Sequence, residues 1–441
     1  MQKRFAAALM LAAVLLSAGC VPNTPQTPSE PPAPEVIQPQ PPAPAPEPEP
    51  EPEPIVKTAT ATVAATGDIL MHYPVIKSGS RGDGTYNFDS IFTYINPYVA
   101  EADFAAANLE TTLNGLDNGY PYQGYPRFNS PDEIVYGLKN AGFDMLLTAN
   151  NHTFDTGEKG FFRTLSVVDE AELVRIGTNA SPEEKKYTLQ EINGISVGMI
   201  CYTYETEDGD PAKKSLNCLP VTERAGKLVN TFHYARLEEF YADLEGKLSD
   251  MAQDGAQASI VFLHWGNEYQ LAENDTQREM AQRICDLGVD VIIGGHPHVV
   301  QPVDLLTSRT DETHKMVCLY SMGNAVSNQR ISQLPTYKGY TEDGVLFQVQ
   351  FAAYSDGSVV LESADALPTW VNLTRSEGSG KTAYEIIPLD REVEDWKSAF
   401  TLSDSEYAGA EQSYARTMSI LGEGLEKVRQ GLEAQPLPTD Q

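Results

Sequence analysis

Basic residues are scarce in this sequence of 441 residues, where 31 Lys and Arg stand against 62 Asp and Glu, a formal net charge of −31. A surface with this charge repels phosphate backbones and anionic lipid headgroups, so we expect neither nucleic acid nor an anionic membrane surface as a partner. The same surface tolerates cations, including metal ions, although an excess of carboxylates also serves solubility alone.

Cysteine is also rare, with five residues in the whole chain. Besides Cys20 these are Cys201, Cys218, Cys285 and Cys318, and no two of them are spaced C-x-x-C. The missing spacing argues against a zinc site built from thiolates. Three of the last four lie in apolar stretches typical of small core residues, and the sequence leaves their pairing in disulfides open.

The apolar stretch Phe5–Leu16 is too short to cross a bilayer, and it follows two basic residues as in a secretory signal peptide. It ends in Ser17-Ala18-Gly19-Cys20, which resembles the lipobox of bacterial lipoproteins except that Ser17 stands where Leu is usual. We therefore expect residues 1–20 to be a lipoprotein signal peptide. Lipid on Cys20 would anchor the protein to the extracellular face of the bacterial cytoplasmic membrane. The alternative is an ordinary secretory signal with release into the medium.

Residues 21–56 are dense in proline and contain six Glu but no Lys or Arg. Proline fixes the φ angle and like charges repel, so such a segment forms a disordered, extended spacer without a core. At roughly 3.1 Å per residue it would reach on the order of 100 Å. We expect it to be a tether that lifts a folded domain away from the membrane.

After the tether, β-branched apolar runs alternate with helical patterns, which predicts an α/β fold with a largely parallel sheet. We expect the folded domain over residues 57–390 and a C-terminal helical segment and tail over residues 391–441. A β-hairpin is expected to turn at Asp356-Gly357, and the helical segment Glu406–Glu433 is interrupted by glycines. Asp275 is the expected N-cap of the clearest helix. The expected strands are Thr58–Thr66, Phe104–Ala107, Met145–Thr148, Ser196–Tyr202, Ser259–Leu263, Val289–Ile293 and Val317–Tyr320, and the expected helices are Pro131–Ala141, Gly160–Glu172 and Thr276–Leu287.

Five of the expected strands run into side chains that can bind metal ions. In a parallel sheet all carboxyl ends lie at one edge, so we expect these side chains to converge although they are spread over 230 positions. Carboxylates bind hard divalent cations, and imidazoles suit Zn²⁺, Mn²⁺ or Fe. The candidate residues are Asp68 and His72, then Glu110, then Asn150, Asn151, His152 and Asp155, then His264, and finally His296 and His298.

Each motif taken alone has a structural alternative. Asp68 could be a turn residue, Glu110 a carboxylate at a helix start, and Asn150-Asn151 turn formers. His264 could be a core histidine, and His72 is either a ligand or a structural residue behind the ligands. Because all of the placements occur at strand ends, together they favour a polar, metal-binding cluster.

At these residues the chain resembles the CapA family, whose members are associated with capsular poly-γ-glutamate production. The resemblance runs from about Ala61 to Asn324, and more weakly to about Leu373. It rests on Gly67-Asp68, Asn108-Leu109-Glu110, Ala149-Asn150-Asn151-His152 with Asp155 and Gly157, His264-Trp265-Gly266 with Glu268, Gly295-His296-Pro297-His298 with Gln301-Pro302, and Tyr320-Ser321-Met322-Gly323-Asn324.

The CapA family is in turn similar to the calcineurin-like metallophosphoesterases, which implies a four-layer α/β sandwich with mostly parallel central sheets and a two-metal centre at the strand ends. By this resemblance Asp68 is the ligand of the first motif, and Glu110 stands where a bridging Asp is usual. Asn151 is an amide ligand and His152 the catalytic imidazole beside it. The resemblance further implies that one metal is bound by His264 and His296, and the other by His298.

The sequence departs from that superfamily in three places. The first-motif histidine usually follows the Asp by two residues, whereas His72 follows Asp68 by four. The bridging carboxylate is Glu110 instead of Asp, and Asn-Asn-His replaces Gly-Asn-His-Asp/Glu before residue 153. These departures leave the identity of the metals, the occupancy of both sites and the reaction open.

The resemblance implies a surface-anchored protein that acts in the synthesis, export or attachment of capsular poly-γ-glutamate or a related wall polymer. Its cofactors would be two divalent metal ions (Mn, Zn or Fe) in a hydrolase-like, phosphoesterase-like site. Its partners would be an anionic polymer or phosphoester substrate and membrane proteins of capsule synthesis. The alternative is a non-catalytic polymer-binding or assembly protein with a vestigial or structural metal site.

Overall fold

The computed structural model describes residues 31–34, 53–116, 119–206, 213–375 and 381–435. The chain divides into two compact units, residues 1–53 and 54–441, and the fold described here is that of the second unit. The expected signal peptide, its lipidation site Cys20 and most of the tether lie outside the described residues. In the part of the chain that is described, no helix is both long enough and apolar enough to span a membrane.

The strands of the first sheet are β1 Lys57–Ile69, β2 Phe104–Leu109, β3 Met145–Leu147, β4 Val174–Ile176, β14 Asn324–Val326, β15 Asp343–Tyr354, β16 Val359–Arg375 and β17 Thr382–Pro388. Their order is β17-β16-β15-β1-β2-β3-β4, and β14 pairs with the end of β1. The half from β1 to β4 is parallel, whereas β1, β15, β16 and β17 are antiparallel to one another in succession. The hairpin predicted at Asp356-Gly357 is the connection between β15 and β16.

The strands of the second sheet are β5 Thr188–Ile192, β6 Ile195–Tyr204, β9 Thr231–Phe232, β10 Ala258–His264, β11 Val291–Gly295, β12 Val303–Thr307 and β13 Lys315–Leu319. Their order is β12-β13-β11-β10-β6-β5, with β9 on β6. The strands from β13 to β6 are parallel, and β12 and β5 add antiparallel edges. A separate small hairpin pairs β7 Ser215–Leu216 with β8 Leu219–Pro220. The expected parallel arrangement therefore holds for one half of the first sheet and for the centre of the second.

The α-helices are α1 Tyr73–Ser78, α2 Asn96–Val99, α3 Glu133–Asn140, α4 Gly157–Glu170, α5 Glu223–Gly226, α6 Leu237–Gln253, α7 Asp275–Asp286, α8 Trp396–Ala399 and α9 Asp404–Glu433, and the 3-10 turns are η1 Asp89–Phe92, η2 Tyr234–Arg236, η3 Pro335–Tyr337 and η4 Tyr340–Glu342. Apolar residues of α1, α3 and α4 pack on the outer face of the first sheet, and those of α6 and α7 pack on the outer face of the second. The inner faces of the two sheets pack on each other.

Side-chain alternation along β1 produces this layering. Val63 and Ala65 lie in the core between the sheets, whereas Ala64 between them packs in the outer core under the helices. Successive side chains of a strand point to opposite faces, so a strand buried on both faces must be apolar throughout. The structure confirms the predicted four-layer α/β sandwich.

Helix α7 begins one residue earlier than the sequence indicated. The side chain of Asn274 accepts a hydrogen bond from the backbone N–H of Gln277 (2.8 Å), and the Gln277 side chain accepts one from the Asn274 N–H (3.1 Å). This reciprocal pair is a capping box, so the N-cap is Asn274 and the prediction of Asp275 was wrong. Asp275 is the first helical residue, where its negative charge interacts favourably with the positive end of the helix dipole.

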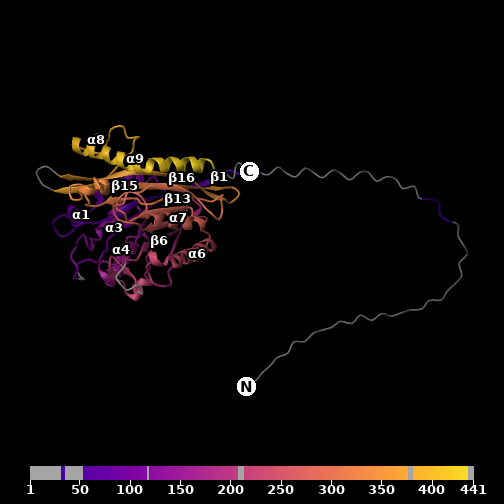
Figure 1. Cartoon of the computed structure of the whole chain (residues 1–441), viewed down its shortest axis with the longest axis horizontal. Coiled ribbons are helices and arrows are strands. Elements are labelled where there is room, and N and C mark those ends of the chain that lie inside the picture. The colour runs from indigo at the N-terminus through magenta and orange to yellow at the C-terminus, as the bar shows by residue number, and fades with distance from the viewer. Residues whose placement is uncertain (1–30, 35–52, 117–118, 207–212, 376–380, 436–441) are drawn as a thin grey trace, which may run out of the picture. The chain divides into compact units, whose positions relative to one another are not determined.

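The C-terminal helix α9 is continuous, although the sequence suggested that glycines interrupt it. Its glycines allow close packing instead: a Cβ atom on Gly424 would lie 2.0 Å from the carbonyl oxygen of Val303 in β12. Leu421, Val428 and Leu432 enter the core between the sheets. Figure 1 shows α9, in yellow, lying along β16, and the same helix contacts β12 of the second sheet. The helix therefore holds the two sheets together at one side.

The four cysteines that the structure describes are free thiols. Cys201, Cys285 and Cys318 are buried and Cys218 is exposed. The three buried thiols are small core residues, as their sequence context indicated.

Candidate metal centre

Backbone register brings the predicted ligands of the first sheet together. Asp68 on β1 lies opposite Asn108 on β2 and opposite Asn324 on β14. On the second sheet His264, the last residue of β10, lies opposite Gly295, the last residue of β11. Because these strands are parallel, their carboxyl ends form one edge, as the sequence predicted.

Two glycines allow the sheets to meet at this edge. A Cβ atom on Gly67 would lie 2.0 Å from the carbonyl oxygen of Gly323, and one on Gly294 would lie 2.0 Å from that of Tyr320. Only residues without a side chain permit such backbone contacts. The segment 320–324 therefore passes between β1 and β11, where the N–H of Asp68 donates to Gly323 (3.0 Å).

The loop that follows β11 carries two histidines in the left-handed backbone region. The φ angle is 98° at His296 and 57° at His298, on either side of Pro297. Non-glycine residues rarely adopt positive φ, and each instance costs on the order of 1–3 kcal/mol. The carbonyl oxygen of Pro297 accepts a hydrogen bond from Tyr269 (2.8 Å), which holds the loop. The strain is localised at the two residues that present imidazoles to the site.

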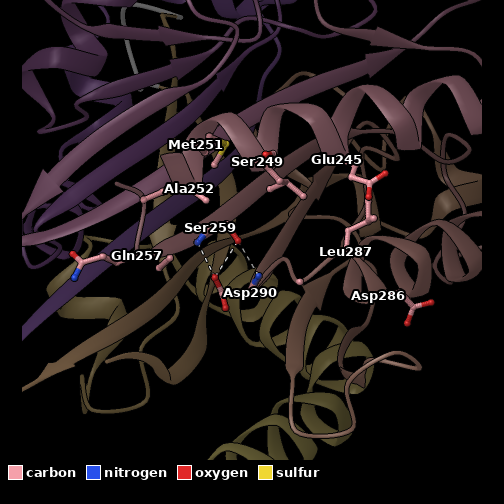
Figure 2. Close-up of a pocket in the computed structure, with 13 residues that line it drawn as sticks. Glu245, Ser249, Met251, Ala252, Gln257, Ser259, Asp286, Leu287 and Asp290 are labelled. Carbon is pink, nitrogen blue, oxygen red and sulfur yellow. Dashed lines mark hydrogen bonds between the residues drawn. The ribbon is translucent and has the colours of Figure 1, made fainter. Parts of the chain in front are cut away.

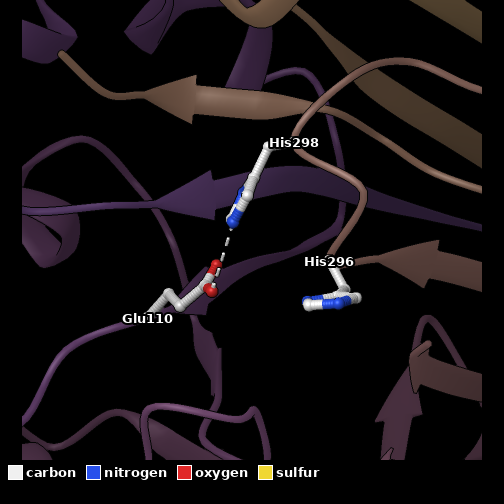
Figure 3. Close-up of side chains that lie close together, drawn as sticks. All are labelled: Glu110, His296 and His298. Atoms are coloured by element: carbon white, nitrogen blue, oxygen red, sulfur yellow. Dashed lines mark ion pairs between the residues drawn. The ribbon is translucent and has the colours of Figure 1, made fainter. Parts of the chain in front are cut away.

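Glu110 occupies the centre of the cluster and is completely buried. Its Oε1 atom lies 3.6 Å from the Nε2 atom of His264 and 3.9 Å from the Nε2 atoms of both His152 and His298. Figure 3 shows the carboxylate facing His298, with the ring of His296 beside them. Burial, and then the charge of Asp68, hold the pKa of Glu110 well above its ordinary value.

The ligand atoms form two overlapping groups, in each of which all atoms lie within 4.8 Å of one another. One group is Glu110, His296 and His298, and the other is Asp68, Glu110 and His264. The resemblance implied a different division, with His264 and His296 on one metal and His298 on the other. Glu110 belongs to both groups, which is the position of a bridging ligand.

Unpaired buried atoms show that this donor set fits a divalent cation. Three buried atoms of the site have no hydrogen-bond partner among the described residues: both carboxylate oxygens of Glu110 and the Nδ1 atom of His296. Leaving such groups buried and unpaired costs about 1–3 kcal/mol each, more for a charge, unless a cation compensates. Burial also keeps the pKa of His264 and His296 well below the ordinary value, so both imidazoles are in the neutral form that binds metal.

Asn151 and His298 each contact another of the candidate ligands. The Oδ1 atom of Asn151 is 2.9 Å from the Nε2 atom of His264, and the Nδ1 atom of His298 is 3.0 Å from the Oδ2 atom of Asp68. Burial opposes a charge on His298, but the hydrogen bond to Asp68 and its charge raise the pKa of the imidazole.

His152 pairs with Asp155, since its Nδ1 atom lies 2.7 Å from the Oδ2 atom of that residue. The other ring nitrogen, Nε2, faces Glu110. The Phe128 ring packs edge-on against the imidazole, with the centroids 4.7 Å apart, and the Phe128 N–H donates to the same Asp155 oxygen (2.6 Å). The predicted catalytic histidine is thus fixed at one nitrogen and directed at the ligands with the other.

His72 stands outside both groups of ligands. Its Nδ1 atom accepts a hydrogen bond from the backbone N–H of Asn328 (3.2 Å), and its ring packs edge-on against Phe128 at 5.4 Å. Burial, and then the positive charge of His298, lower the pKa of His72 to about 4. In this geometry His72 contacts Asn328 and Phe128 next to the site and is not part of either group of ligands.

Sequence reasoning did not assign roles to two asparagines that orient the ligands. The Nδ2 atom of Asn108 donates to Asp68 (2.7 Å), and its Oδ1 atom accepts from Asn150 (3.1 Å). Asn324 places its Oδ1 atom 3.2 Å from Nδ1 of His298 and donates to the carbonyl oxygen of that residue. Both asparagines lie inside motifs at strand ends, which is the signal that could have identified them.

A third asparagine reaches the site from a distant hairpin. Asn217, in the turn between β7 and β8, has a φ angle of 49° and donates to Asp155 (2.8 Å) and to the carbonyl oxygen of Pro126 (2.8 Å). Asn217 and Cys218, both at positive φ, form the two-residue turn of this hairpin, but nothing in the sequence of the turn indicates what it contacts.

Aromatic rings flank the histidines. The Tyr204 ring lies 4.7 Å from that of His296, and the Tyr269 ring lies 6.1 Å from that of His298 and stacks on Tyr337. The Tyr125 side chain, in the loop between β2 and α3, is 76% exposed.

Comparison with known proteins places residues 62–329 in a family described as bacterial capsule synthesis protein PGA_cap. The capsule biosynthesis protein CapA of Bacillus anthracis is 28% identical over 75% of this chain and 71% of its own length. The PGA biosynthesis protein CapA of Bacillus subtilis (strain 168) is 30% identical over 60% of this chain, which spans 62% of that protein.

Solved structures give distant matches. The NAD nucleotidase of Haemophilus influenzae has a TM-score of 0.41 and 12% identity, covering 85% of this chain and 66% of its own. The calcineurin-like phosphoesterase YfkN of Bacillus subtilis has a TM-score of 0.37 and 16% identity, covering 70% of this chain and 90% of its own. The family match itself covers more than half of the sequence and includes every ligand described above, and the chain accordingly belongs to the bacterial capsule synthesis protein PGA_cap family.

Proposed function

We propose that this protein is a metal-dependent hydrolase of capsule-polymer metabolism that acts on poly-γ-glutamate or on a related anionic polymer or phosphoester. The observation that carries the proposal is the buried, unpaired carboxylate of Glu110 among His264, His296 and His298. The family description and the names of the two Bacillus relatives support capsule polymer as the context.

The two ligand groups support a centre for two divalent cations (Mn, Zn or Fe), for which Glu110 would be a shared ligand. When bound, such ions act as Lewis acids and lower the pKa of coordinated water. His296 and His298 would hold one ion and Asp68 and His264 the other, each together with Glu110, since the ligand atoms of each group lie within 4.8 Å of one another. Asn108 and Asn324 fix the orientation of Asp68 and His298 by their hydrogen bonds.

His152 is the residue that moves a proton in this proposal. The Asp155 carboxylate at Nδ1 stabilises the charged imidazolium, which leaves Nε2 to donate a proton to the leaving oxygen or nitrogen of the substrate. Phe128 and Asn217 hold the pair in place from either side. Because His152 and Asp155 are buried, water competes little for the hydrogen bonds of this pair.

The proposal also includes a location. Lipid on Cys20 and the Pro- and Glu-rich segment would hold the domain at the extracellular face of the cytoplasmic membrane, near membrane proteins of capsule synthesis. Support for this part comes from the sequence of residues 1–56 alone.

One observation favours a non-catalytic alternative, in which the protein binds the polymer through a vestigial or structural metal site. The position two residues after Asp68, where the superfamily has a ligand histidine, is Leu70, and it is buried. Since His72 bonds to Asn328 instead, one of the two sites has one imidazole fewer than the superfamily pattern.

Metal analysis and turnover on the purified full chain test the proposal together. We expect about two equivalents of transition metal, and turnover of phosphoesters or γ-glutamyl oligomers that chelation abolishes. A double variant, His296→Ala with His298→Ala, should lose both metal and turnover. Metal that is bound without turnover of either substrate class would favour the polymer-binding alternative, and a chain that takes up no metal after supplementation would contradict both.

A further inference from the structure

A cavity of about 460 Å³ lies against the first residues of β10, away from the metal centre (Figure 2). The Asp290 carboxylate in its wall accepts hydrogen bonds from both the N–H (2.8 Å) and the hydroxyl (3.0 Å) of Ser259. These groups satisfy one another, and among the described residues none of the buried polar atoms without a partner lies in this wall. The cavity therefore gives no sign of a ligand, whereas the rim of the metal centre does.

The strand next to β10 also ends at the metal centre. This strand is β6, which pairs with β10 in parallel so that Thr203 lies opposite His264. Its last residue is Tyr204. Since the carboxyl ends of parallel strands lie at one edge of a sheet, Tyr204 comes to the edge that also carries His264 and His296. The expected strand ended at Tyr202, so Tyr204 was not among the predicted site residues.

The Tyr204 ring packs beside two of the candidate ligands. Its centroid lies 4.7 Å from that of His296 and 6.5 Å from that of His264, and it is nearly parallel to the His264 ring, at 6°. The Tyr234 ring lies 6.0 Å away and is itself fixed, because its hydroxyl accepts a hydrogen bond from the N–H of Gly266 (2.8 Å). These ring contacts hold the Tyr204 side chain in position before any ligand binds.

The hydroxyl of Tyr204 is left without a partner. It forms no hydrogen bond to another described residue, whereas the Tyr269 hydroxyl, near His298, accepts one from Gln329 (3.0 Å). The Tyr204 side chain is half-buried, and its oxygen is not among the atoms that are buried without a partner, so the oxygen is accessible to solvent. A phenol loses its proton only at about pH 10, so at neutral pH this hydroxyl can donate a hydrogen bond to an incoming acceptor.

The Tyr204 hydroxyl and the His152 imidazole approach the ligands from different sheets. His152 lies after β3 of the first sheet, with its Nε2 atom 3.9 Å from Glu110. Tyr204 ends β6 of the second sheet, beside His296. Burial, then the charge of Glu268 and, among weaker causes, that of Glu110 raise the pKa of the phenol, in keeping with its place beside these carboxylates. A group bound at Glu110 would therefore have one hydrogen-bond donor on each side.

We propose that the Tyr204 hydroxyl donates a hydrogen bond to an oxygen of a tetrahedral oxyanion bound at the metal centre, on the side of His296. A donor that is fixed in advance stabilises the charge that develops on such an oxygen in the transition state. The inference rests on the proposed function, since it gives the hydrolase a second catalytic residue, which stabilises the oxyanion while His152 protonates the leaving group. Tyr204 keeps its own proton throughout. A phosphoryl group and the tetrahedral adduct of an amide both present an oxygen of this kind.

The test is Tyr204→Phe in the metal-loaded full chain, which removes the hydroxyl and keeps the ring. Binding of inorganic phosphate is measured by titration calorimetry, and turnover is measured with p-nitrophenyl phosphate and with phenyl phosphate. We expect kcat to fall about 10–100-fold and the Kd of phosphate to rise about tenfold, because one hydrogen bond to a charged group is lost. Both esters should be slowed by the same factor, since they share the oxyanion and differ only in the leaving group. Metal content and melting temperature should not change.

The matched control is Tyr202→Phe, the same substitution two residues earlier on β6. Tyr202 is buried and its hydroxyl donates to Asp243 on α6 (2.8 Å), so this variant should lower the melting temperature but leave kcat and the Kd of phosphate within about twofold of the wild type. A second variant, Tyr204→Leu, also removes the ring beside His296. It should add a loss of metal affinity to the effects of Tyr204→Phe, which separates the packing of the ring from the donation by the hydroxyl.

Three results for Tyr204→Phe would overturn the proposed hydrogen bond. Wild-type kcat and phosphate affinity would show that the hydroxyl has no role, without contradicting the hydrolase. Metal lost together with turnover would show that the hydroxyl acts through the metal ions. A larger fall in kcat with phenyl phosphate than with p-nitrophenyl phosphate would place the hydroxyl at the leaving group instead of the oxyanion.

The binding of phosphate separates this inference from the proposed function. Phosphate that binds only when metal is present, and about tenfold more weakly to Tyr204→Phe, supports the hydrogen bond even in a chain that hydrolyses neither phosphoesters nor γ-glutamyl oligomers. Such a result would contradict the hydrolase alone. A metal-loaded wild type that binds no phosphate and hydrolyses neither substrate class would overturn both.

Discussion

The Nδ1 atom of His152 lies 2.7 Å from the Oδ2 atom of Asp155, and both side chains are buried beside the metal ligands. This contact leaves Nε2 as the ring nitrogen that faces the candidate ligand Glu110 and, in the proposed mechanism, the substrate. Neither residue belongs to the groups that can hold a metal, so metal binding and the proposed proton transfer involve different side chains.

Replacing His152 by Ala should abolish most turnover without removing the metal. General acid catalysis contributes about 10²–10⁴-fold, so we expect kcat to fall by this factor while the metal content stays at the wild-type value. The measurement is kcat together with elemental analysis of the same sample. Metal lost in parallel with turnover would show that His152 acts as a ligand.

Asn217→Ala tests the distant hairpin contact. The variant removes one hydrogen bond to Asp155 but leaves the His152 pair itself, so we expect a smaller fall in kcat, about five- to twentyfold, with KM little changed. Kinetic constants of Asn217→Ala and of Asn217→Asp, which cannot donate to a carboxylate, provide the check. Wild-type kcat in both variants would remove Asn217 from the catalytic arrangement.

Metal binding should release protons through Glu110. Burial and the charge of Asp68 raise the pKa of this carboxyl group, so the metal-free protein holds a proton there that a cation must displace. Titration calorimetry in two buffers of different ionisation enthalpy measures the release. The Glu110→Gln variant carries no such proton, so it should release fewer protons on binding metal and should bind metal more weakly. An unchanged number of released protons would contradict the assignment of the proton to Glu110.

Chelation should lower the melting temperature. A ligand that binds only the native state at a concentration of 100 Kd stabilises it by about 2.7 kcal/mol, which corresponds to several degrees in Tm for a domain of this size. Thermal unfolding with and without chelator measures the shift. His72→Ala should keep the whole shift, because His72 lies outside both ligand groups, and a lost shift in this variant would make His72 a ligand.

Arg416→Ala should destabilise the fold by about 3–5 kcal/mol, because it leaves a buried carboxylate unpaired. Arg416, on α9, donates to both oxygens of Asp343 at the start of β15, at 2.7 and 2.6 Å, and Asp343 is buried. The matched control is Arg429→Ala on the same helix, which loses only exposed ion pairs with Glu426 and Glu433 and should cost less than about 1 kcal/mol. Chemical unfolding of both variants tests the difference, and equal stabilities would contradict it.

The ligand positions could be predicted because each depends on local sequence. A buried strand such as β10 is a visible apolar run, and its last residue, His264, is the first polar group after it. Parallel pairing then places all such residues at one edge without further information. The alternation of strands and helices likewise predicted an α/β fold with a parallel sheet, whereas the four-layer sandwich was implied by the family resemblance.

What sequence reasoning missed depends on contacts between distant segments. The hydrogen bond from Asn217 to Asp155 joins residues 62 positions apart, and the packing of α9 on β12 depends on Gly424 meeting Val303. The role of His72 is decided by Asn328, 256 residues away. Hydrophobic periodicity contains no information about such partners, so these details required the folded geometry.

The position of β1 in the first sheet sets the order in which the site can be assembled. β1 pairs on one side with β2 and on the other with β15, which is synthesised nearly 280 residues later. At roughly 5–20 residues per second, the first strand waits about 15 to 60 seconds on the ribosome for its second neighbour. Asp68 therefore meets His298 and Asn324 only when most of the chain has been made, so a complete set of ligands for metal forms late in synthesis or after it.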